Sequence, residues 1–161
     1  MQVELEKREF AADLVRRFET FAEFKLSKDE GKTTIHLAYD SPFRFSPPVD
    51  TTIGIKVNDY TDIIVDKLLT FFGRAEPRDA VDLFFILKTE DLWKLSELAP
   101  QKDPGFDPYW LAVAFEKVRG FPDEISQWPV DMLVEVDARE IKGKFLSLTR
   151  QIMDKIKKIN P

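Results

Sequence analysis

Residues 59–87 read Asp59-Tyr-Thr-Asp-Ile-Ile-Val-Asp-Lys-Leu-Leu-Thr-Phe-Phe-Gly-Arg-Ala-Glu-Pro-Arg-Asp-Ala-Val-Asp-Leu-Phe-Phe-Ile-Leu87. Apolar side chains recur at helical spacing on both sides of a Gly-Arg-Ala-Glu-Pro elbow, so this segment predicts two short helices. Residues 58–59 cap the first helix, which we expect to end at Gly73. Pro77 opens the second helix, which we expect to run to about residue 88. Charged groups on helices this apolar need partners or a ligand.

The charged side chains of these helices fall on defined faces. Lys67 and Arg74 are seven residues apart and share one face of the first helix, and the elbow brings Arg78 close to the same basic surface. Asp79 and Asp82 stand at positions i and i+3 and share a face of the second helix. Because that helix is otherwise very apolar, we expect Asp82 to be at least half buried and to need a lysine or arginine partner.

The spacing of these charges leaves two interpretations open. In the first, they form a structural ion-pair network, in which Arg78 or Lys67 neutralises Asp82 and Asp79 stabilises a helix N-terminus. In the second, they cradle a triphosphate or a substrate RNA: lysine and arginine hold phosphate oxygens, and the aspartates orient the cations. Spacing alone favours the ion-pair network, because buried carboxylates are usually paired for structural reasons.

The residues before the elbow predict a helix and then a small sheet. Phe10, Leu14, Phe18 and Phe21 recur at helical spacing, which predicts an amphipathic helix over residues 3–21. Segments 22–28 and 33–39 alternate apolar and polar residues around a turn at 29–32, which predicts a β-hairpin. Residues 41–48 are expected to form a proline-rich loop, and residues 52–57 a third strand.

The residues after the elbow predict further helices. We expect helices over 89–98, 109–118 and 138–158, a loop over 100–108 and a linker over 119–129. The last helix carries an apolar stripe and a basic face; a packed helix with a solvated face is favoured over RNA contact or docking on a partner. The stripe consists of Ile141, Phe145, Leu148, Ile152, Ile156 and Ile159. Trp93, Trp110 and Trp128 are expected to be core or loop anchors, and not platforms for stacked bases.

The order of these elements predicts an α+β protein with a small antiparallel or mixed sheet of about three strands and a helical bundle behind it. We assign residues 1–58 to the part with a helix and the sheet, and residues 59–161 to the helical part. The chain has 161 residues and a hydrophobic content of 43%, which is enough for a core. Its net charge of −5 argues against nucleic-acid binding through overall charge.

Several classes of site are excluded by composition. The chain has no cysteine and one histidine, which removes disulfides, thiol catalysis and the common zinc sites. His36 alternates with apolar neighbours, so we expect it on the polar side of its strand. No apolar run is long enough to span a membrane and the N-terminus has no apolar signal core, so we expect a cytoplasmic protein.

Residues 62–87 resemble the downstream motif region of the AbiEii/AbiGii toxin family, a family of nucleotidyltransferase-fold proteins that includes toxins of type IV toxin–antitoxin pairs. The resemblance is best over residues 32–88, and its most specific element is a lysine followed by an Arg-Asp-x-x-Asp helix. It implies a partial nucleotidyltransferase-like fold and Mg²⁺-dependent transfer of a nucleotide from an NTP to an acceptor such as a tRNA end. It also implies roles for individual residues: Lys67 contacts the triphosphate, Asp79 or Asp82 belongs to the late acidic motif, and Arg74 and Arg78 support it.

The sequence also departs from the pattern of this family. The family begins with a Gly-Ser element and an Asp-x-Asp pair whose carboxylates hold metal ions, and this sequence contains neither. A third carboxylate is expected on the middle strand, where His36 stands, and the nearest acid, Asp40, lies beyond it. We therefore expect an incomplete metal site and no nucleotide transfer by this chain alone. We expect a fragment or a degenerate relative, and the thin sheet favours a fragment.

The sequence also allows a second class of function. The chain is alternatively a non-catalytic interaction protein that binds a cognate antitoxin or another partner through an exposed sheet edge or an apolar surface. The same open edge allows a homodimer.

Overall fold

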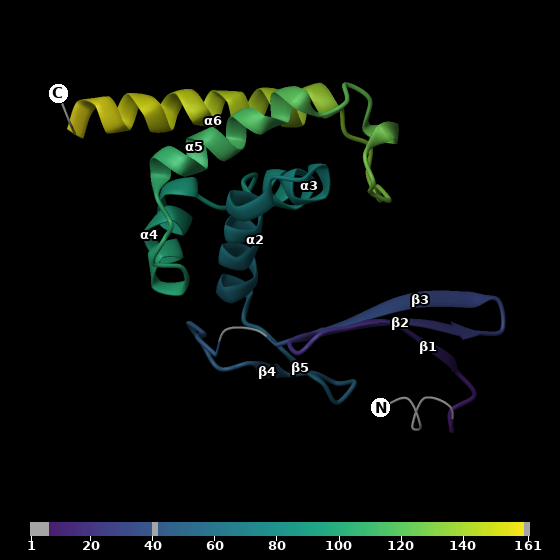
Figure 1. Cartoon of the computed structure of the whole chain (residues 1–161). Helices are drawn as coiled ribbons and strands as arrows, with labels where there is room; N and C mark the ends of the chain where they lie inside the picture. The colour runs from purple at the N-terminus through teal and green to yellow at the C-terminus, as the bar shows by residue number, and fades with distance from the viewer. Residues whose placement is uncertain (1–6, 40–41, 160–161) are drawn as a thin grey trace. The chain divides into compact units, whose positions relative to one another are not determined.

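The computed structural model describes residues 7–39 and 42–159 and contains two compact units, residues 1–42 and residues 43–161 (Figure 1). The first, the sheet unit, contains a three-stranded antiparallel sheet. The second, the helical unit, contains a short β-hairpin and five α-helices among its described residues. The α+β class predicted from the sequence is confirmed. The units divide upstream of residue 58, because residues 43–58 fold with the helices.

The sheet unit is an antiparallel meander. Its strands are β1 (Ala11–Arg17), β2 (Phe21–Lys28) and β3 (Gly31–Ala38), in the order β1-β2-β3. The β2–β3 hairpin confirms the sequence prediction, and Asp29 takes the left-handed conformation in its turn, with φ 53°. Among the described residues of the unit, the buried core is small and consists of Ala12, Phe24 and Leu26.

The helix predicted over residues 3–21 is wrong for the residues that the structure describes. Residues 11–17 form β1, which pairs with β2 so that Ala12 lies opposite Leu26, while residues 3–6 lie outside the described part. The error has a simple cause: Phe10, Leu14 and Phe18 are four residues apart, and a spacing of four fits one face of a strand as well as one face of a helix. Pairing with β2 decides between the two.

The third predicted strand is mostly a turn. Only β4 (Val49–Asp50) and β5 (Lys56–Val57) pair with each other, as a separate two-stranded hairpin. Thr51 donates its backbone N–H to the carbonyl of Ile55, and Gly54 has a φ of +78°. A residue with positive φ cannot continue a strand, so the segment folds back at this glycine.

The two helices predicted around the elbow are present, with small shifts at their ends. They are α2 (Tyr60–Arg74) and α3 (Pro77–Ile86). The side chain of Asp59 accepts the backbone N–H of Thr61 and caps α2, as expected. The helix continues through Gly73, and Ala75 adopts the left-handed C-cap conformation with φ 50°.

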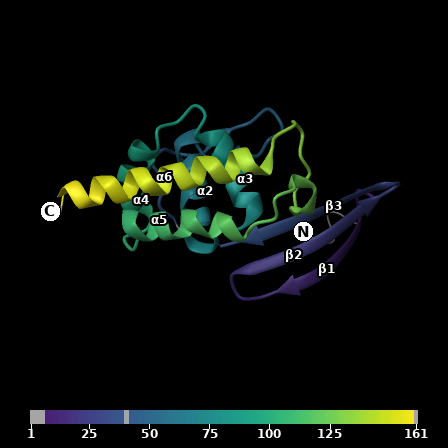
Figure 2. The same ribbon diagram turned by 90° about the horizontal axis from the view of Figure 1, so that it is seen from above.

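Three further helices complete the helical unit. They are α4 (Leu92–Lys102), α5 (Pro108–Glu116) and α6 (Ala138–Ile159), with 3₁₀ turns at Lys117–Gly120 and Ile125–Gln127. Helix α4 extends through Pro100, so the predicted loop begins later than expected. Helices α5 and α6 lie side by side in both views (Figures 1 and 2), and α2 contacts α3, α4 and α5.

Aromatic packing joins these helices into one core. The ring of Phe71 stacks on that of Phe145 at 5.0 Å between centroids, and the ring of Phe115 lies 5.5 Å from Phe71. These three side chains come from α2, α6 and α5 and are fully buried. The apolar stripe predicted on the last helix is confirmed for Ile141, Phe145, Leu148 and Ile152, which are buried, whereas the side chain of Ile159 lies outside the described part. Within residues 7–39 and 42–159, no helix is both long and apolar enough to cross a membrane.

Candidate functional site

Two ion pairs join α2 to α3 across the elbow. Lys67 on α2 reaches Asp82 on α3, and Arg74 at the end of α2 reaches Asp79 in the first turn of α3. Lys67 is one of the two partners that the sequence suggests for Asp82, and the structure forms this pair. The pairing of Arg74 with Asp79 was not predicted.

The Arg74–Asp79 pair is bidentate and buried on its acidic side. Arg74 donates Nε to Asp79 Oδ2 at 2.7 Å and Nη2 to Oδ1 at 2.6 Å, and the Asp79 side chain is only 3% exposed. Burial by itself raises the pKa of Asp79, but the hydrogen bonds and charge of Arg74 outweigh it, so that this pKa lies below its ordinary value. The backbone N–H of Glu76 also donates to Asp79 Oδ2. Asp79 therefore has its carboxylate fully engaged inside the fold.

The Lys67–Asp82 pair is open to solvent. Lys67 Nζ lies 2.6 Å from Asp82 Oδ2, and each side chain is 43% exposed. This confirms the expectation that Asp82 is at least half buried and paired with a lysine or arginine. A solute can reach both groups, and an exposed pair of this kind is held by little net free energy, about 0–1 kcal/mol.

Arg78 lies at the same elbow but has a different partner from the one considered. Its Nε donates to Glu76 Oε2 at 2.9 Å, and the same oxygen lies 3.8 Å from Arg74 Nε. Arg78 is thus close to Arg74, as expected, while Lys67 takes the place beside Asp82. We name Lys67, Arg74, Glu76, Arg78, Asp79 and Asp82 the elbow cluster; it combines three cations with three carboxylates.

A second, more deeply buried ion pair was not singled out in the sequence. Lys102 Nζ, at the end of α4, lies 2.7 Å from Asp62 Oδ1 and 2.7 Å from Asp66 Oδ1 on α2. The Asp62 side chain is fully buried, and it also accepts the backbone N–H groups of Phe45 and Ser46. Burial raises the pKa of Asp62, but its hydrogen bonds with Lys102 and with these two N–H groups outweigh burial and lower that pKa.

A signal for Asp62 exists in the sequence. Asp62 precedes the buried Val65 by three residues and Leu68 by six, so it continues the apolar stripe of α2 toward its first turn. A carboxylate on that stripe is expected to be buried and paired. Nothing local points to Lys102, because it lies forty residues away.

His36 and its neighbours form a polar row across the sheet unit. Arg16, Glu23 and His36 lie opposite one another on β1, β2 and β3, and Glu23 accepts hydrogen bonds from Arg16. His36 Nε2 lies 4.0 Å from Glu23, and its side chain is 56% exposed, which agrees with the expected place on the polar side of the strand. Asp40 lies outside the described residues. In the part of the chain that the structure describes, no three His, Cys, Asp or Glu side chains gather as a metal site.

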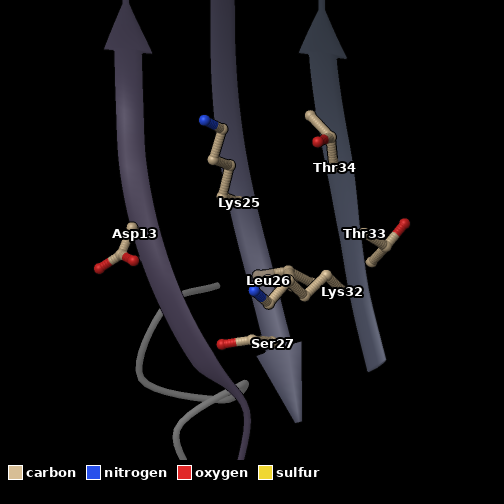
Figure 3. Close-up of a pocket in the computed structure, with 7 residues that line it drawn as sticks. All are labelled: Asp13, Lys25, Leu26, Ser27, Lys32, Thr33 and Thr34. Atoms are coloured by element: carbon tan, nitrogen blue, oxygen red, sulfur yellow. The ribbon is translucent and has the colours of Figure 1, made fainter. Parts of the chain in front are cut away.

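A hollow in the sheet unit contains none of the elbow cluster. It measures about 540 Å³ and draws its lining from all three strands (Figure 3). Asp13 comes from β1, residues 25–27 from β2 and residues 32–34 from β3. Five of these seven residues are exposed, so the hollow is open and holds no converging set of buried polar groups.

Comparison with known proteins identifies the family. The sequence model of the family described as nucleotidyl transferase AbiEii toxin, type IV TA system, matches residues 15–154, a range that includes the elbow cluster and the Asp62–Lys102 pair. No curated protein matches the chain. No solved structure matches it either. Because the family match extends over most of the 161 residues, the chain belongs to the AbiEii nucleotidyltransferase toxin family of type IV toxin–antitoxin systems.

Proposed function

We propose that this chain binds a nucleoside triphosphate at the elbow cluster, as part of a toxin that transfers a nucleotide to an acceptor such as a tRNA end. Membership of a nucleotidyltransferase toxin family supports the reaction class. The observation that carries the proposed site is the half-exposed Lys67–Asp82 pair, which lies beside two partly exposed arginines.

The charges of the elbow cluster explain how a triphosphate would bind. A triphosphate carries several negative charges and competes with the single carboxylate of Asp82 for the Lys67 ammonium. The Arg78 side chain is 51% exposed, and among the described residues it pairs only with the partly exposed carboxylate of Glu76. Its guanidinium can therefore turn to a second phosphate oxygen. Arg74 keeps N–H donors beyond the two that Asp79 occupies.

The two aspartates receive different roles in this proposal. Asp82 loses Lys67 to the phosphates and then faces the substrate, where its carboxylate accepts a hydrogen bond from a substrate hydroxyl. Asp79 is a positioning residue: both of its oxygens hold Arg74, and it is too buried to meet a ligand. The late acidic residue that contacts substrate is therefore Asp82.

The family resemblance also implies Mg²⁺, and the described residues do not fit a metal centre. Each carboxylate of the elbow cluster is engaged by a lysine or arginine, and no metal-binding group of side chains is formed in residues 7–39 and 42–159. We expect the 161-residue chain to bind nucleotide without transferring it.

The decisive experiment is calorimetric titration of the full chain with each NTP in the presence of Mg²⁺. Lys67→Ala is expected to weaken NTP binding about tenfold or more, because a hydrogen bond to a charged group is lost. Lys94→Ala removes the charge of an exposed lysine on α4 and is the matched control, expected to bind as wild type. Equal affinity of Lys67→Ala and wild type would overturn the proposed site, and failure of every NTP to bind would favour the non-catalytic interaction protein.

We also propose two partners, a cognate antitoxin and a second copy of this chain. A type IV toxin–antitoxin family supports a cognate antitoxin as the functional partner. The strand order leaves one edge of β3 without a neighbouring strand among the described residues, which supports a homodimer through that edge. Light scattering at several protein concentrations would separate a dimer from a monomer.

A further inference from the structure

A small cavity lies where α4, α5 and α6 meet in the helical unit. It measures about 170 Å³, and Trp93, Pro108, Ile152 and Ile156 supply its apolar lining. Sites for drug-sized ligands start at about 300 Å³, so this cavity limits an occupant to a single ring system. Its polar lining consists of Ser96, Glu97 and Lys155, and Lys155 Nζ lies 4.1 Å from the centroid of the Trp93 ring. A flat ring with N–H groups at its edge matches this lining, because the apolar side chains can pack against its faces and the Glu97 carboxylate can accept its N–H.

Two exposed aromatic rings begin next to that cavity. Tyr109 and Trp110 directly follow Pro108 at the start of α5, and they are 45% and 59% exposed. Their centroids are 5.2 Å apart, in an edge-to-face pair. Trp110 was expected to anchor the core or a loop, and this expectation is wrong, because its ring lies on the solvent side of a helix. Such large apolar surface, left open to water, marks a binding surface.

Exposed cations on α6 accompany these rings. The start of α5 lies beside the C-terminal half of α6 (Figure 2). Pro108, Ile152 and Ile156 accordingly line one cavity. The exposed cations of that half are Arg150, Lys155, Lys157 and Lys158. Over the residues that the structure describes, no ion pair involves any of these four. Arg150 donates a hydrogen bond to the carbonyl of Leu146, and Lys155 lies over the Trp93 ring. Asp154 is the one exposed acid among residues 150–158, so in a chain of net charge −5 this half of α6 is a local basic surface.

We propose that this surface binds single-stranded nucleic acid. We name it the α6-end surface: Trp93, Tyr109, Trp110, Arg150, Lys155, Lys157 and Lys158. One unpaired base enters the cavity beside Trp93, a second stacks on the exposed Trp110, and the connecting phosphates contact the cations of α6. A duplex hides the faces of its bases and cannot fill the cavity. The α6-end surface shares no residue with the elbow cluster, so this binding does not require the proposed triphosphate site.

The test is fluorescence anisotropy of the full chain with labelled twelve-nucleotide probes: a single-stranded RNA, a single-stranded DNA and the matching duplex, each at low and moderate salt. Single strands are expected to bind more tightly than the duplex, with affinity that falls as salt rises. Comparison of the RNA with the DNA shows which sugar is preferred. The absence of single-strand binding at low salt, or equal affinity for the duplex, would overturn the proposal.

Two variants locate the binding on this surface. Trp110→Ala removes an exposed ring and is expected to weaken binding by about 5- to 150-fold. Lys157→Glu with Lys158→Glu is expected to weaken binding further and to reduce its dependence on salt. Lys25→Glu with Lys32→Glu makes the same charge change at exposed positions of the sheet unit and is the matched control. Lys67→Ala is expected to retain full binding, so that failure here and failure of the triphosphate site are separate results. Wild-type affinity in the α6-end variants would sink the proposal.

Discussion

Lys102 and Asp62 form a buried ion pair between the end of α4 and the first turn of α2, with Lys102 Nζ 2.7 Å from Asp62 Oδ1. Both side chains are almost removed from solvent, at 7% and 0% exposure. Because Asp62 also accepts the backbone N–H groups of Phe45 and Ser46, one carboxylate ties together two helices and the segment before them. The start of α2, and hence the helix that carries Lys67, is positioned by this contact.

Removal of Lys102 should destabilise the helical unit strongly. Lys102→Met leaves the Asp62 charge buried without its cation, which we expect to lower the free energy of unfolding by about 3–5 kcal/mol. Urea denaturation followed by circular dichroism measures this loss. Lys94→Met replaces an exposed lysine of the same helix and should change stability by less than about 0.5 kcal/mol. If both variants unfold at the same urea concentration, the buried pair contributes no more to the free energy of unfolding than an exposed lysine does.

Asp62→Asn in the Lys102→Met background should restore part of that loss. The amide is neutral, and its oxygen can still accept an N–H from the segment at residues 45–46, so no buried charge remains without a partner. We expect the double variant to be more stable than the sum of the single changes indicates, and a double-mutant cycle in urea measures this coupling. Strict additivity would mean that the two side chains do not interact.

Stability should fall in acid below the ordinary carboxyl range. The pKa values of Asp62 and Asp79 are both lowered from 3.8 in the folded chain, so the unfolded chain takes up protons first as the pH drops. Their contribution is fully present above about pH 3.8 and is lost as the pH falls through their lower folded pKa values. Urea midpoints from pH 7 to pH 2.5 measure this loss, and Asp62→Asn should make the decline shallower. An unchanged acid profile in that variant would contradict the assignment.

Asp79 and Asp82 should differ in what their removal does. Asp79→Asn disrupts the bidentate bond to Arg74 at a buried position, and we expect it to lower the free energy of unfolding by about 2–4 kcal/mol. Asp82→Asn changes a half-exposed pair and should alter stability by less than about 1 kcal/mol. Chemical denaturation of both variants makes the comparison. Equal losses would remove the distinction between a positioning aspartate and a substrate-facing one.

The two compact units should differ in resistance to opening. Among its described residues the sheet unit buries only Ala12, Phe24 and Leu26 in its core, whereas the helical unit buries a large core around Phe71. Native-state hydrogen exchange is expected to show weaker protection for the amides of β1–β3 than for those of α2, α5 and α6. Phe24→Ala should accelerate exchange in the sheet unit alone. Equal protection throughout would mean that the chain opens as one cooperative unit.

Much of the helical unit could be predicted from the sequence, because its signals are local. Apolar periodicity, the Asp59 cap and Pro77 locate α2 and α3 to within a few residues, and the stripe on α6 is buried as expected. The need of Asp82 for a cation was visible in the same way, since a carboxylate on an apolar helix must be neutralised. These inferences use neighbours within about one or two turns, where spacing and packing coincide.

The remaining features depend on contacts between distant residues. Residues 11–17 fit a helix or a strand equally well, and only pairing with β2 selects the strand. Lys102 lies forty residues from Asp62, so the chain's local pattern cannot pair them. Likewise, Trp110 is apolar enough for a core, but the packing of α5 against α6 turns the other face of α5 inward and leaves this ring in solvent. Local chemistry sets which segments can be helices and which charges need partners; the three-dimensional packing decides which partner each one meets.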